Sequence, residues 1–290
     1  MSYDNNKIIN LGQLKASAQK IKGRDIFDYL DDFATTDNGA GLHNSIYRGK
    51  NLGATLTADQ IARITDRTFK GLWLGDYWTK SITFTIYDDQ NEDVEKSVTV
   101  SAIMSIVDHD YYRYSGDDPQ LTTPHLVVMP DFPFFSAPMN MTNTTEGAYV
   151  LSKMRTVYLA GAENAFNTFF GSDHLISYRD YLQNAVTDGR ATAGAWYDCK
   201  VELMDESQAY GGLVFDSGAS VGTAIYNRYS VSTKQFALFR VRPDLISKRQ
   251  YVWLRNVVSS AGFALVSNRG LANYSYASPR RGVRPFALIH

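Results

Sequence analysis

The chain has 290 residues, of which 44% are apolar and 20% charged, so it can bury a large core and is neither a disordered nor a collagen-like chain. Its 29 basic and 30 acidic residues give a formal net charge of -1, which disfavours nucleic acid as a partner because no overall positive field attracts a polyphosphate. The single cysteine, Cys199, excludes an intramolecular disulfide and a multi-thiolate metal site.

The N-terminal region favours an attachment segment over a targeting signal. Residues 1–25 contain no apolar signal-peptide core, and no later run approaches the roughly 18 apolar residues of a membrane span, so we expect folding in a reducing cytosol and no membrane insertion. Apolar residues at helical spacing behind Asn10 predict a short amphipathic helix that must dock on something: Leu11, Leu14, Ala18 and Ile21. Residues 35–53 have the composition of a linker. We therefore divide the chain into an attachment or oligomerisation segment with its linker, 1–54, and a body, 55–290.

Three further segments predict helices. The stretch Thr57–Gln60 has the form of a capping box and would begin a helix that runs to about Arg67. From Ala148 to Phe169 the apolar residues keep a broadly helical period, and Gly171 supplies a stop. A shorter helix is expected from Tyr178 to Ala185.

Strands are predicted on both sides of these helices. Ile82, Phe84 and Ile86 alternate with threonines, and the polar turn Asp88–Asp93 and the β-rich run Val98–Val107 complete a hairpin. Short strands between glycine and serine clusters account for the rest: Leu126–Met129, Lys200–Met204, Gly212–Phe215, Gln235–Val241, Tyr251–Arg255, Gly262–Val266 and Phe286–Ile289. The pattern predicts an α+β architecture.

One sequence pattern suggests an enzyme. Gly218–Gly222 matches the G-x-S-x-G nucleophile elbow around Ser220, and Asp244 and His290 follow in the order used by hydrolases. However, the flanking residues are typical of a turn, and the only downstream histidine is the last residue, where chains tend to fray. A serine hydrolase acting on a cell-surface polymer is therefore a remote alternative, and we expect no enzyme.

Metal and cofactor sites have little support. Asp89–Asp93 imitates the start of a calcium loop, but Val94 and Val100 stand where glycine and a bidentate glutamate are required. A second group has no recognised ligand spacing and is more typical of surface and strand-end positions: Asp108, His109, Asp110, His125 and His174. Phosphate-cradling loops are absent from the sequence. We expect no metal and no cofactor.

The most specific segment lies near the C-terminus. Trp253-Leu254-Arg255 is followed by Gly282-Val283-Arg284-Pro285, and this W-L-R … G-V-R-P pattern resembles the closing segment of a domain found in bacteriophage structural proteins. It is also similar to the final strands of C-type-lectin-like folds. Phe69–Trp78 and Met139–Tyr149 resemble segments of the same phage proteins, so the resemblance extends from Phe69 to His290. It implies a C-type-lectin-like domain of short antiparallel strands and two or more helices.

The resemblance separates scaffold residues from ligand residues. Trp253 and Leu254 would be core, Arg255 and Arg284 would bridge strand ends or bind a carboxylate, and Gly282 would permit a tight turn. Pro285 would begin an edge or terminal strand. The polar, aromatic loop 267–281 would display the ligand surface, with these residues in contact with a glycan or protein: Asn268, Arg269, Asn273, Tyr274, Tyr276 and Arg280.

The function that the resemblance implies is that of a virion structural protein: a head fibre, tail fibre or tail-tip component made in the host bacterial cytoplasm. Its partners would be other virion proteins, further copies of itself, with a trimer as the first expectation, and a glycan or protein of the host surface. The alternative is a purely architectural decoration or connector protein, whose tyrosine-rich loops pack against neighbouring virion subunits.

Overall fold

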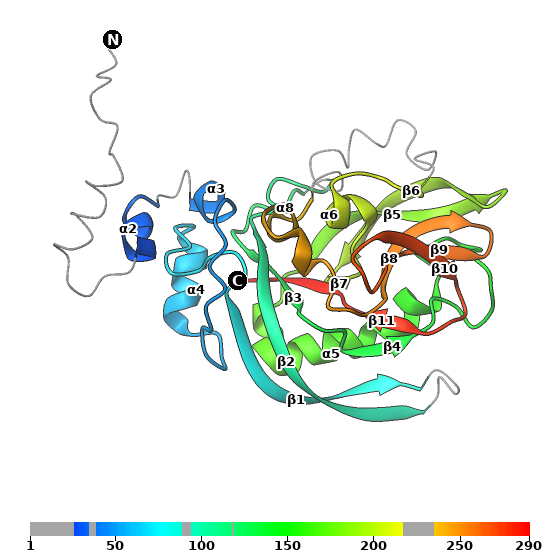
Figure 1. Cartoon of the computed structure of the whole chain (residues 1–290), viewed down its shortest axis with the longest axis horizontal. Coiled ribbons are helices and arrows are strands. Elements are labelled where there is room, and N and C mark those ends of the chain that lie inside the picture. The colour runs from blue at the N-terminus through cyan, green and yellow to red at the C-terminus, as the bar shows by residue number, and fades with distance from the viewer. Residues whose placement is uncertain (1–25, 35–38, 89–93, 118, 217–234) are drawn as a thin grey trace, which may run out of the picture.

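The computed structural model describes residues 26–34, 39–88, 94–117, 119–216 and 235–290 (Figure 1). They form a mixed α+β structure with two five-stranded sheets and a two-stranded hairpin, which confirms the predicted α+β class. The predicted helix over residues 11–21 lies outside the described residues.

The first sheet contains the C-terminal strand of the chain in an interior position. In spatial order its strands are β1 (Tyr77–Tyr87), β2 (Glu95–His109), β3 (Leu126–Pro130), β12 (Phe286–Ile289) and β7 (Val201–Glu202), and all neighbours are antiparallel. The predicted hairpin and the strands at β3 and β12 are therefore confirmed. Every residue of β3 and β12 is buried, as expected for continuous apolar runs inside a sheet. Of the predicted strand Lys200–Met204, only Val201 and Glu202 pair.

The second sheet carries the other strands of the C-terminal motif. In spatial order they are β10 (Ala272–Tyr276), β9 (Gly262–Val266), β8 (Val252–Ser259), β11 (Arg281–Val283) and β4 (Phe135–Ala137). The pairing of β8 with β11 is parallel and the others are antiparallel. Strand β10 thus lies at one edge, so one side of its backbone has no strand partner in the described part of the chain.

The third sheet corrects a helix prediction. Residues Tyr178–Thr187 form strand β5, not a helix, and pair with β6 (Arg190–Cys199). The turn between them has Asp188 and Gly189 at φ values of 50° and 74°, which is the Asp-Gly signature of a tight β-hairpin. This turn signal and the partner strand outweigh the helical spacing of the apolar residues.

Helices occupy the remaining described segments. They are α2 (Ile26–Asp32), α3 (Gly39–His43), α4 (Ala58–Thr65), the π-helix η1 (Met154–Tyr158), α5 (Leu159–Phe170), α6 (Glu206–Tyr210) and α8 (Ala237–Val241), with the 3-10 turns η2 (Ser172–His174) and η4 (Pro243–Leu245). The capping box before α4 is confirmed, because Thr57 and Gln60 exchange hydrogen bonds of 3.0 and 3.2 Å. Gly171, at φ 94°, ends α5 as predicted.

Two strand predictions and one helix start are wrong. Gln235–Val241 contains helix α8, because the carboxylate of Asp108 accepts the main-chain N–H of Ala237 at 2.8 Å at its first residue. Gly212–Phe215 forms no strand, since the carboxylate of Glu206 binds its amides. The helix expected from Ala148 begins only at Met154; Ala148 has φ 53°, which no right-handed helix accommodates.

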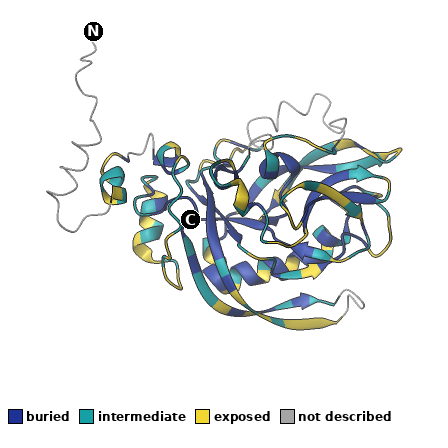
Figure 2. Ribbon diagram, in the orientation of Figure 1, coloured by how far each residue is buried: buried dark blue, intermediate teal, exposed yellow. Residues whose placement is uncertain are grey.

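The core lies between the sheets and α5. Helix α5 packs on β1 so closely that a Cβ at Gly161 would lie 2.7 Å from Ile86 Cγ2. Trp78 of β1 meets Phe170 edge to face with ring centroids 5.7 Å apart. Figure 2 shows buried residues concentrated in the central strands and exposed ones towards the far end of the β1–β2 hairpin.

The segment before α4 contacts the body of the protein. Tyr47 forms a parallel bridge with Leu74, and Arg48 forms an ion pair with the buried carboxylate of Asp76. His43 of α3 is fully buried. Residues 39–53 therefore pack against the part of the chain that follows α4, and the division at residue 54 stays a prediction.

Gly282 lies inside a strand and not in the expected tight turn. It is the middle residue of β11 and pairs with Ser136 of β4 and Val252 of β8. A Cβ at this position would lie 2.5 Å from Pro133 Cγ and 2.9 Å from the carbonyl oxygen of Tyr251. Glycine is required here because the backbone of a neighbouring segment approaches closely.

We therefore predict that Gly282→Ala lowers the free energy of unfolding by about 1–3 kcal/mol, since a methyl group must displace a ring and a backbone carbonyl. Gly212→Ala is the matched control, because no atom lies within 4 Å of its Cβ position, and should change stability by less than about 0.5 kcal/mol. Urea unfolding of both variants measures the difference. Equal stabilities would contradict the close approach.

Candidate functional site

The first half of the C-terminal motif forms the centre of the second sheet. Trp253 and Leu254 of β8 are fully buried, as predicted. The indole N–H of Trp253 donates to the carbonyl oxygen of Ala137 in β4 at 2.9 Å. This hydrogen bond crosses the short strand β11 and joins the two strands on either side of it.

Arg255 binds two buried carboxylates, which confirms one of its two predicted roles. Its guanidinium donates to Asp180 of β5 at 2.5 Å and to Asp205, the N-cap of α6, at 3.5 Å. Burial by itself would lower the pKa of Arg255, but the negative charges of Asp180 and Asp205 outweigh burial and hold that pKa well above its usual range. Arg255 is therefore a charged group inside the core.

Hydrogen bonds extend this ion pair to two more elements. The hydroxyl of Tyr112, which follows β2, donates to Asp180 at 2.9 Å and accepts from the side chain of Gln208 in α6 at 2.7 Å. The main-chain N–H of Gln208 donates to Asp205 at 2.7 Å. Each buried charge thus has several partners, as a low-dielectric interior requires.

The second motif arginine binds backbone and not carboxylates. Arg284 donates to the carbonyl oxygens of Pro130 and Ile246, both at 2.8 Å. Burial lowers the pKa of Arg284 to about 10, so it stays protonated at neutral pH. Arg255 and Arg284 are both buried, and their guanidinium groups are already hydrogen-bonded to protein groups, so neither faces a ligand. Both belong to the buried frame of the protein, by which we mean the two five-stranded sheets and the residues that join them.

The predicted display loop contains an edge strand. Residues 272–276 form β10, so the loop is divided into a turn before this strand and a second connection after it. Tyr274 and Tyr276 project from the same face of β10, because alternate residues of a strand share a face, and are 54% and 62% exposed. The ring of Phe215 meets Tyr274 edge to face at 5.5 Å.

All six predicted ligand residues are exposed, but they do not form one surface. Asn268 and Arg269 lie in the turn between β9 and β10. Asn273 lies on the face of β10 opposite the two tyrosines. Arg280 follows β10 and donates to the carbonyl oxygen of Ser136 at 2.8 Å, so its guanidinium takes part in holding the backbone. The side-chain roles assigned to these residues stay predictions.

The turn that carries Asn268 and Arg269 forms one wall of a cleft of about 510 Å³. Residues 243–249 form the other wall. Gly270, at φ 84°, has its Cα turned towards Ile246, so that a Cβ there would lie 3.2 Å from Ile246 Cγ2. The two walls of the cleft therefore lie close to one another at Gly270 and Ile246.

Sequence patterns did not predict that residues 243–249 would line this cleft. The basic pair Lys248-Arg249 was the one available signal, and it carries no motif. Arg249 and Arg269 are brought to the same cleft because β8 and β9 pair as an antiparallel hairpin, which returns the chain to its starting end.

Of the three residues in the hydrolase alternative, the structure describes Asp244 and His290. Ser220 lies outside the described residues. Asp244 accepts hydrogen bonds from Arg242 Nε at 2.8 Å and Nη2 at 2.6 Å, and these bonds lower the pKa of its carboxyl group. The carbonyl oxygen of His290 lies 3.0 Å from Nδ1 of His174. The carboxylate of Asp244 is thus oriented by an arginine.

No group of three or more His, Cys, Asp or Glu side chains in the described residues could hold a metal ion. The calcium-like turn Asp89–Asp93 lies outside them. Asp108 and His109 stand at the end of β2 but are buried, and not on the surface as expected. Asp108 binds Asn44 at 2.9 Å and His109 contacts the carbonyl oxygen of Leu72 at 3.0 Å.

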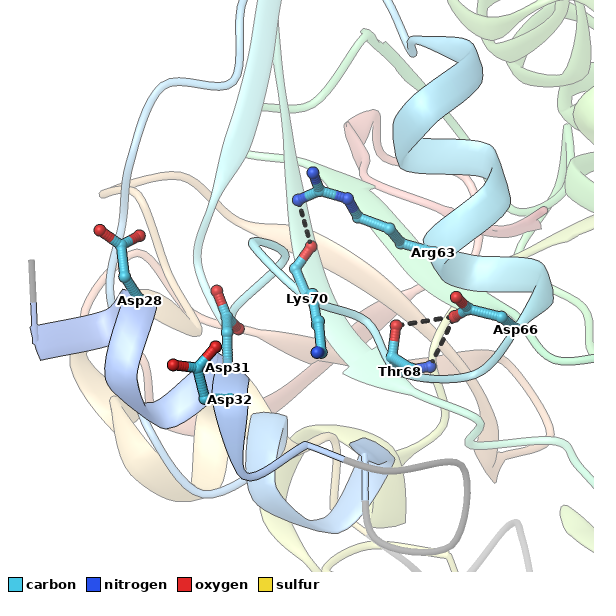
Figure 3. A pocket seen from close by; sticks show the side chains of 7 residues that line it. All are labelled: Asp28, Asp31, Asp32, Arg63, Asp66, Thr68 and Lys70. Carbon is cyan, nitrogen blue, oxygen red and sulfur yellow. Dashed lines mark hydrogen bonds between the residues drawn. The ribbon is translucent and has the colours of Figure 1, made fainter. Parts of the chain in front are cut away.

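A second cleft, of about 430 Å³, lies between α2 and α4 (Figure 3). It is lined by Asp28, Asp31, Asp32, Arg63, Asp66, Thr68 and Lys70. Burial tends to raise the pKa of Asp31, but hydrogen bonds from His43 and Gly71 lower it overall. Arg63 donates to the carbonyl oxygen of Lys70 at 2.9 Å, and Asp66 accepts from Thr68. These groups fasten α2, α4 and the following loop to one another.

Comparisons with known proteins found nothing similar to this chain. No family model, no curated protein and no solved structure matches it. The resemblance to phage structural proteins and to C-type-lectin-like folds therefore stays a prediction. Among the described residues, no helix is both long and apolar enough to cross a membrane.

Breaking the Arg255 cluster should destabilise the protein strongly. Arg255→Met leaves Asp180 and Asp205 buried without a counter-charge, and we expect a loss of roughly 3–5 kcal/mol in the free energy of unfolding. Arg179→Met is the matched control: it removes a more exposed arginine whose partners, Asp117 and Asp198, are 40% and 86% exposed, and should cost less than about 1 kcal/mol. Chemical denaturation of both variants tests this, and similar losses would contradict it.

A buried histidine should make the stability depend on pH. Nδ1 of His125 lies 2.9 Å from the carbonyl oxygen of Thr123, and its Nε2 accepts the N–H of Tyr112 at 3.1 Å. This arrangement needs the neutral ring, because a proton on Nε2 would face another donor. Burial is the main cause of the lowered pKa of His125. The unfolded chain therefore binds more protons below about pH 6.5, and stability should fall as the pH falls through that value.

His125→Gln keeps an acceptor for Tyr112 without a titrating group. The difference in unfolding free energy between wild type and this variant should shrink by up to about 1.4 kcal/mol per pH unit below pH 6.5. Comparing the two proteins isolates His125 from Asp108, whose pKa burial raises to about 7 and which acts in the opposite sense between about pH 4 and 7. Urea unfolding at pH 8, 6.5 and 5 measures the difference; a constant value would contradict the neutral tautomer.

Proposed function

We propose that this protein is a structural component of a phage particle, such as a head fibre, tail fibre or tail tip, and that its C-terminal region binds the host surface. The observation that carries the proposal is that residues 253–290 contain two groups, one buried and one exposed. The motif residues Trp253, Leu254, Arg255 and Arg284 are buried, whereas all six predicted ligand residues are exposed. A rigid frame that presents a polar and aromatic surface is what a binding domain requires.

The finer fold assignment, a C-type-lectin-like domain, belongs to the same proposal. It is supported by the short, mostly antiparallel strands and by the interior positions of β8 and β11, which carry Trp253-Leu254-Arg255 and Gly282-Val283 of the motif. The expected absence of enzymatic activity is likewise part of this proposal.

Strand β10 suits a binding surface for physical reasons. Tyrosine rings offer an apolar face for a sugar or a protein epitope and a hydroxyl for hydrogen bonding, and they lose little conformational freedom on binding. Asn273, on the opposite face of β10, accepts the main-chain N–H of Tyr274 at 2.8 Å through its Oδ1, and its amide NH2 can donate to a ligand on that face. In a homo-oligomer, with a trimer as the first expectation, several weak sites would act together and gain strength through multivalency.

The alternative function is architectural, and one observation favours it. Among the described residues, β10 has no strand partner on its outer side, and Leu271 just before it is 65% exposed. Such an edge can pair with a neighbouring virion subunit. In that case the tyrosines would be buried between subunits and would touch no host molecule.

Cryo-electron microscopy of the intact particle distinguishes these functions. The adhesin proposal expects β10 to face solvent in the assembled virion, with the N-terminal segment directed towards the particle. Burial of β10 between subunits would refute host binding and support the connector function.

The tyrosines of β10 provide a functional test. Replacing Tyr274 and Tyr276 by alanine in the virion should slow adsorption to host cells about tenfold, because buried aromatic contacts dominate binding energy. The same change should alter the unfolding free energy of the purified chain by less than about 0.5 kcal/mol, since both rings are exposed. Leu151→Ala, at another exposed apolar side chain, is the control and should leave adsorption unchanged. Normal adsorption of the double variant would contradict the proposal.

A further inference from the structure

We infer that the cleft between residues 243–249 and 268–270 binds an acidic sugar of the host surface, with Arg249 and Arg269 contacting its carboxylate or phosphate group. This inference rests on the proposed function and adds the chemical class of the ligand and the place where it binds. It adds ligand contacts in the turn that precedes the tyrosines of β10.

The charges around the cleft leave a local positive excess. Arg242 and Asp244 form a two-pronged ion pair, and Lys248 pairs with Asp131 at 3.0 Å. These four groups neutralise one another. The guanidinium groups of Arg249 and Arg269 have no hydrogen bond or ion pair among the described residues, and both line the cleft. Two uncompensated cations in one concave surface attract an anion.

The polar groups of the cleft suit an oxygen-rich ligand. Arginine presents a planar fork of donors that matches the two oxygens of a carboxylate or phosphate. The amide of Asn268 lies in the same wall and can bond to sugar hydroxyls.

The walls of the cleft are held in place by the frame. Arg284 donates to the carbonyl oxygens of Ile246 at 2.8 Å and Leu245 at 3.4 Å, so the buried motif arginine fixes the backbone of one wall. Gly270 in the opposite wall lies close to Ile246, since a Cβ on Gly270 would be 3.2 Å from Ile246 Cγ2. Pre-organised walls reduce the entropy that is lost when a ligand binds. A volume of about 510 Å³ is also in the range of small-ligand sites and would hold one or two sugar rings.

Arg249 has a backbone conformation that makes a clean test possible. Its φ of 60° lies in the left-handed region, where asparagine is better tolerated than most residues. Arg249→Asn therefore removes the guanidinium without adding backbone strain. Arg269→Ala removes the second cation, and Arg269→Lys keeps the charge but not the fork. Arg190→Ala is the matched control, because Arg190 is an exposed arginine at the first residue of β6, outside the cleft.

The test is saturation-transfer NMR and calorimetric titration of the full chain with three probes: glucuronate, glucose 6-phosphate and glucose. We expect one or both acidic sugars to bind, glucose to bind at least tenfold more weakly, and the affinity to fall with added salt. If only glucuronate binds, the natural ligand is a sugar with a carboxylate group. If only glucose 6-phosphate binds, it is a phosphorylated sugar. Arg249→Asn and Arg269→Ala should each lower the affinity about tenfold or more, Arg269→Lys less, and Arg190→Ala not at all.

Three results would overturn the inference: no binding of either acidic sugar, equal binding of glucose, or full affinity in both cleft variants with unchanged thermal unfolding. Its failure is separable from failure of the proposed function. If the cleft variants adsorb to host cells normally while the Tyr274 and Tyr276 variants do not, host binding stands and the acidic-sugar site falls. If neither set of variants alters adsorption, both fall.

Discussion

The ion pair of Arg255 with Asp180 and Asp205 is the interaction on which the arrangement of the protein depends. A guanidinium in a low-dielectric interior is stable only when opposite charges and hydrogen bonds surround it. Here those partners come from β5 and from the N-cap of α6, while Tyr112 adds the connection after β2. The second sheet, the β5–β6 hairpin, α6 and the first sheet must therefore meet at one point. Displacing any one of them would leave a buried charge without a partner.

Arg284 performs a related task where the frame meets the surface. It binds carbonyl oxygens, so it stabilises backbone that no strand partner satisfies, at Pro130 and at Leu245 and Ile246. The second of these places is a wall of the cleft. The two arginines of the motif thus have different physical roles. Arg255 joins layers of the core, and Arg284 fixes the backbone of Leu245 and Ile246, which lie in a wall of the cleft that a ligand can reach.

Overall charge and local charge lead to different conclusions about partners. A net charge of -1 gives no long-range attraction for a polyanion. Even so, acidic and basic side chains are unevenly placed: Asp28, Asp31 and Asp32 gather on α2, while Arg249 and Arg269 face the other cleft. Because salt screens exposed charges beyond about 10 Å, a local group of like charges matters more for a small ligand than the net charge does, and a single anionic group can be recognised by a nearly neutral protein.

Local signals in the sequence determined many of the elements, and long-range contacts determined the others. The capping box at Thr57, the β1–β2 hairpin and the strands β9 and β12 follow from residues within a few positions of one another, so they could be predicted. Tyr178–Thr187 and Ala237–Val241 could not, because a partner strand and a distant carboxylate at Asp108 decide their conformations.

The same division holds for the candidate site. Composition alone identified the polar and aromatic character of residues 267–281, since exposed tyrosine, asparagine and arginine are typical of binding surfaces. That part of this segment is an edge strand, that Arg280 holds backbone, and that Arg249 shares a cleft with Arg269 were decided only by the tertiary structure. The reason is physical: a side chain's type is a property of the sequence, but its neighbours are set by strand pairing between segments far apart in the chain.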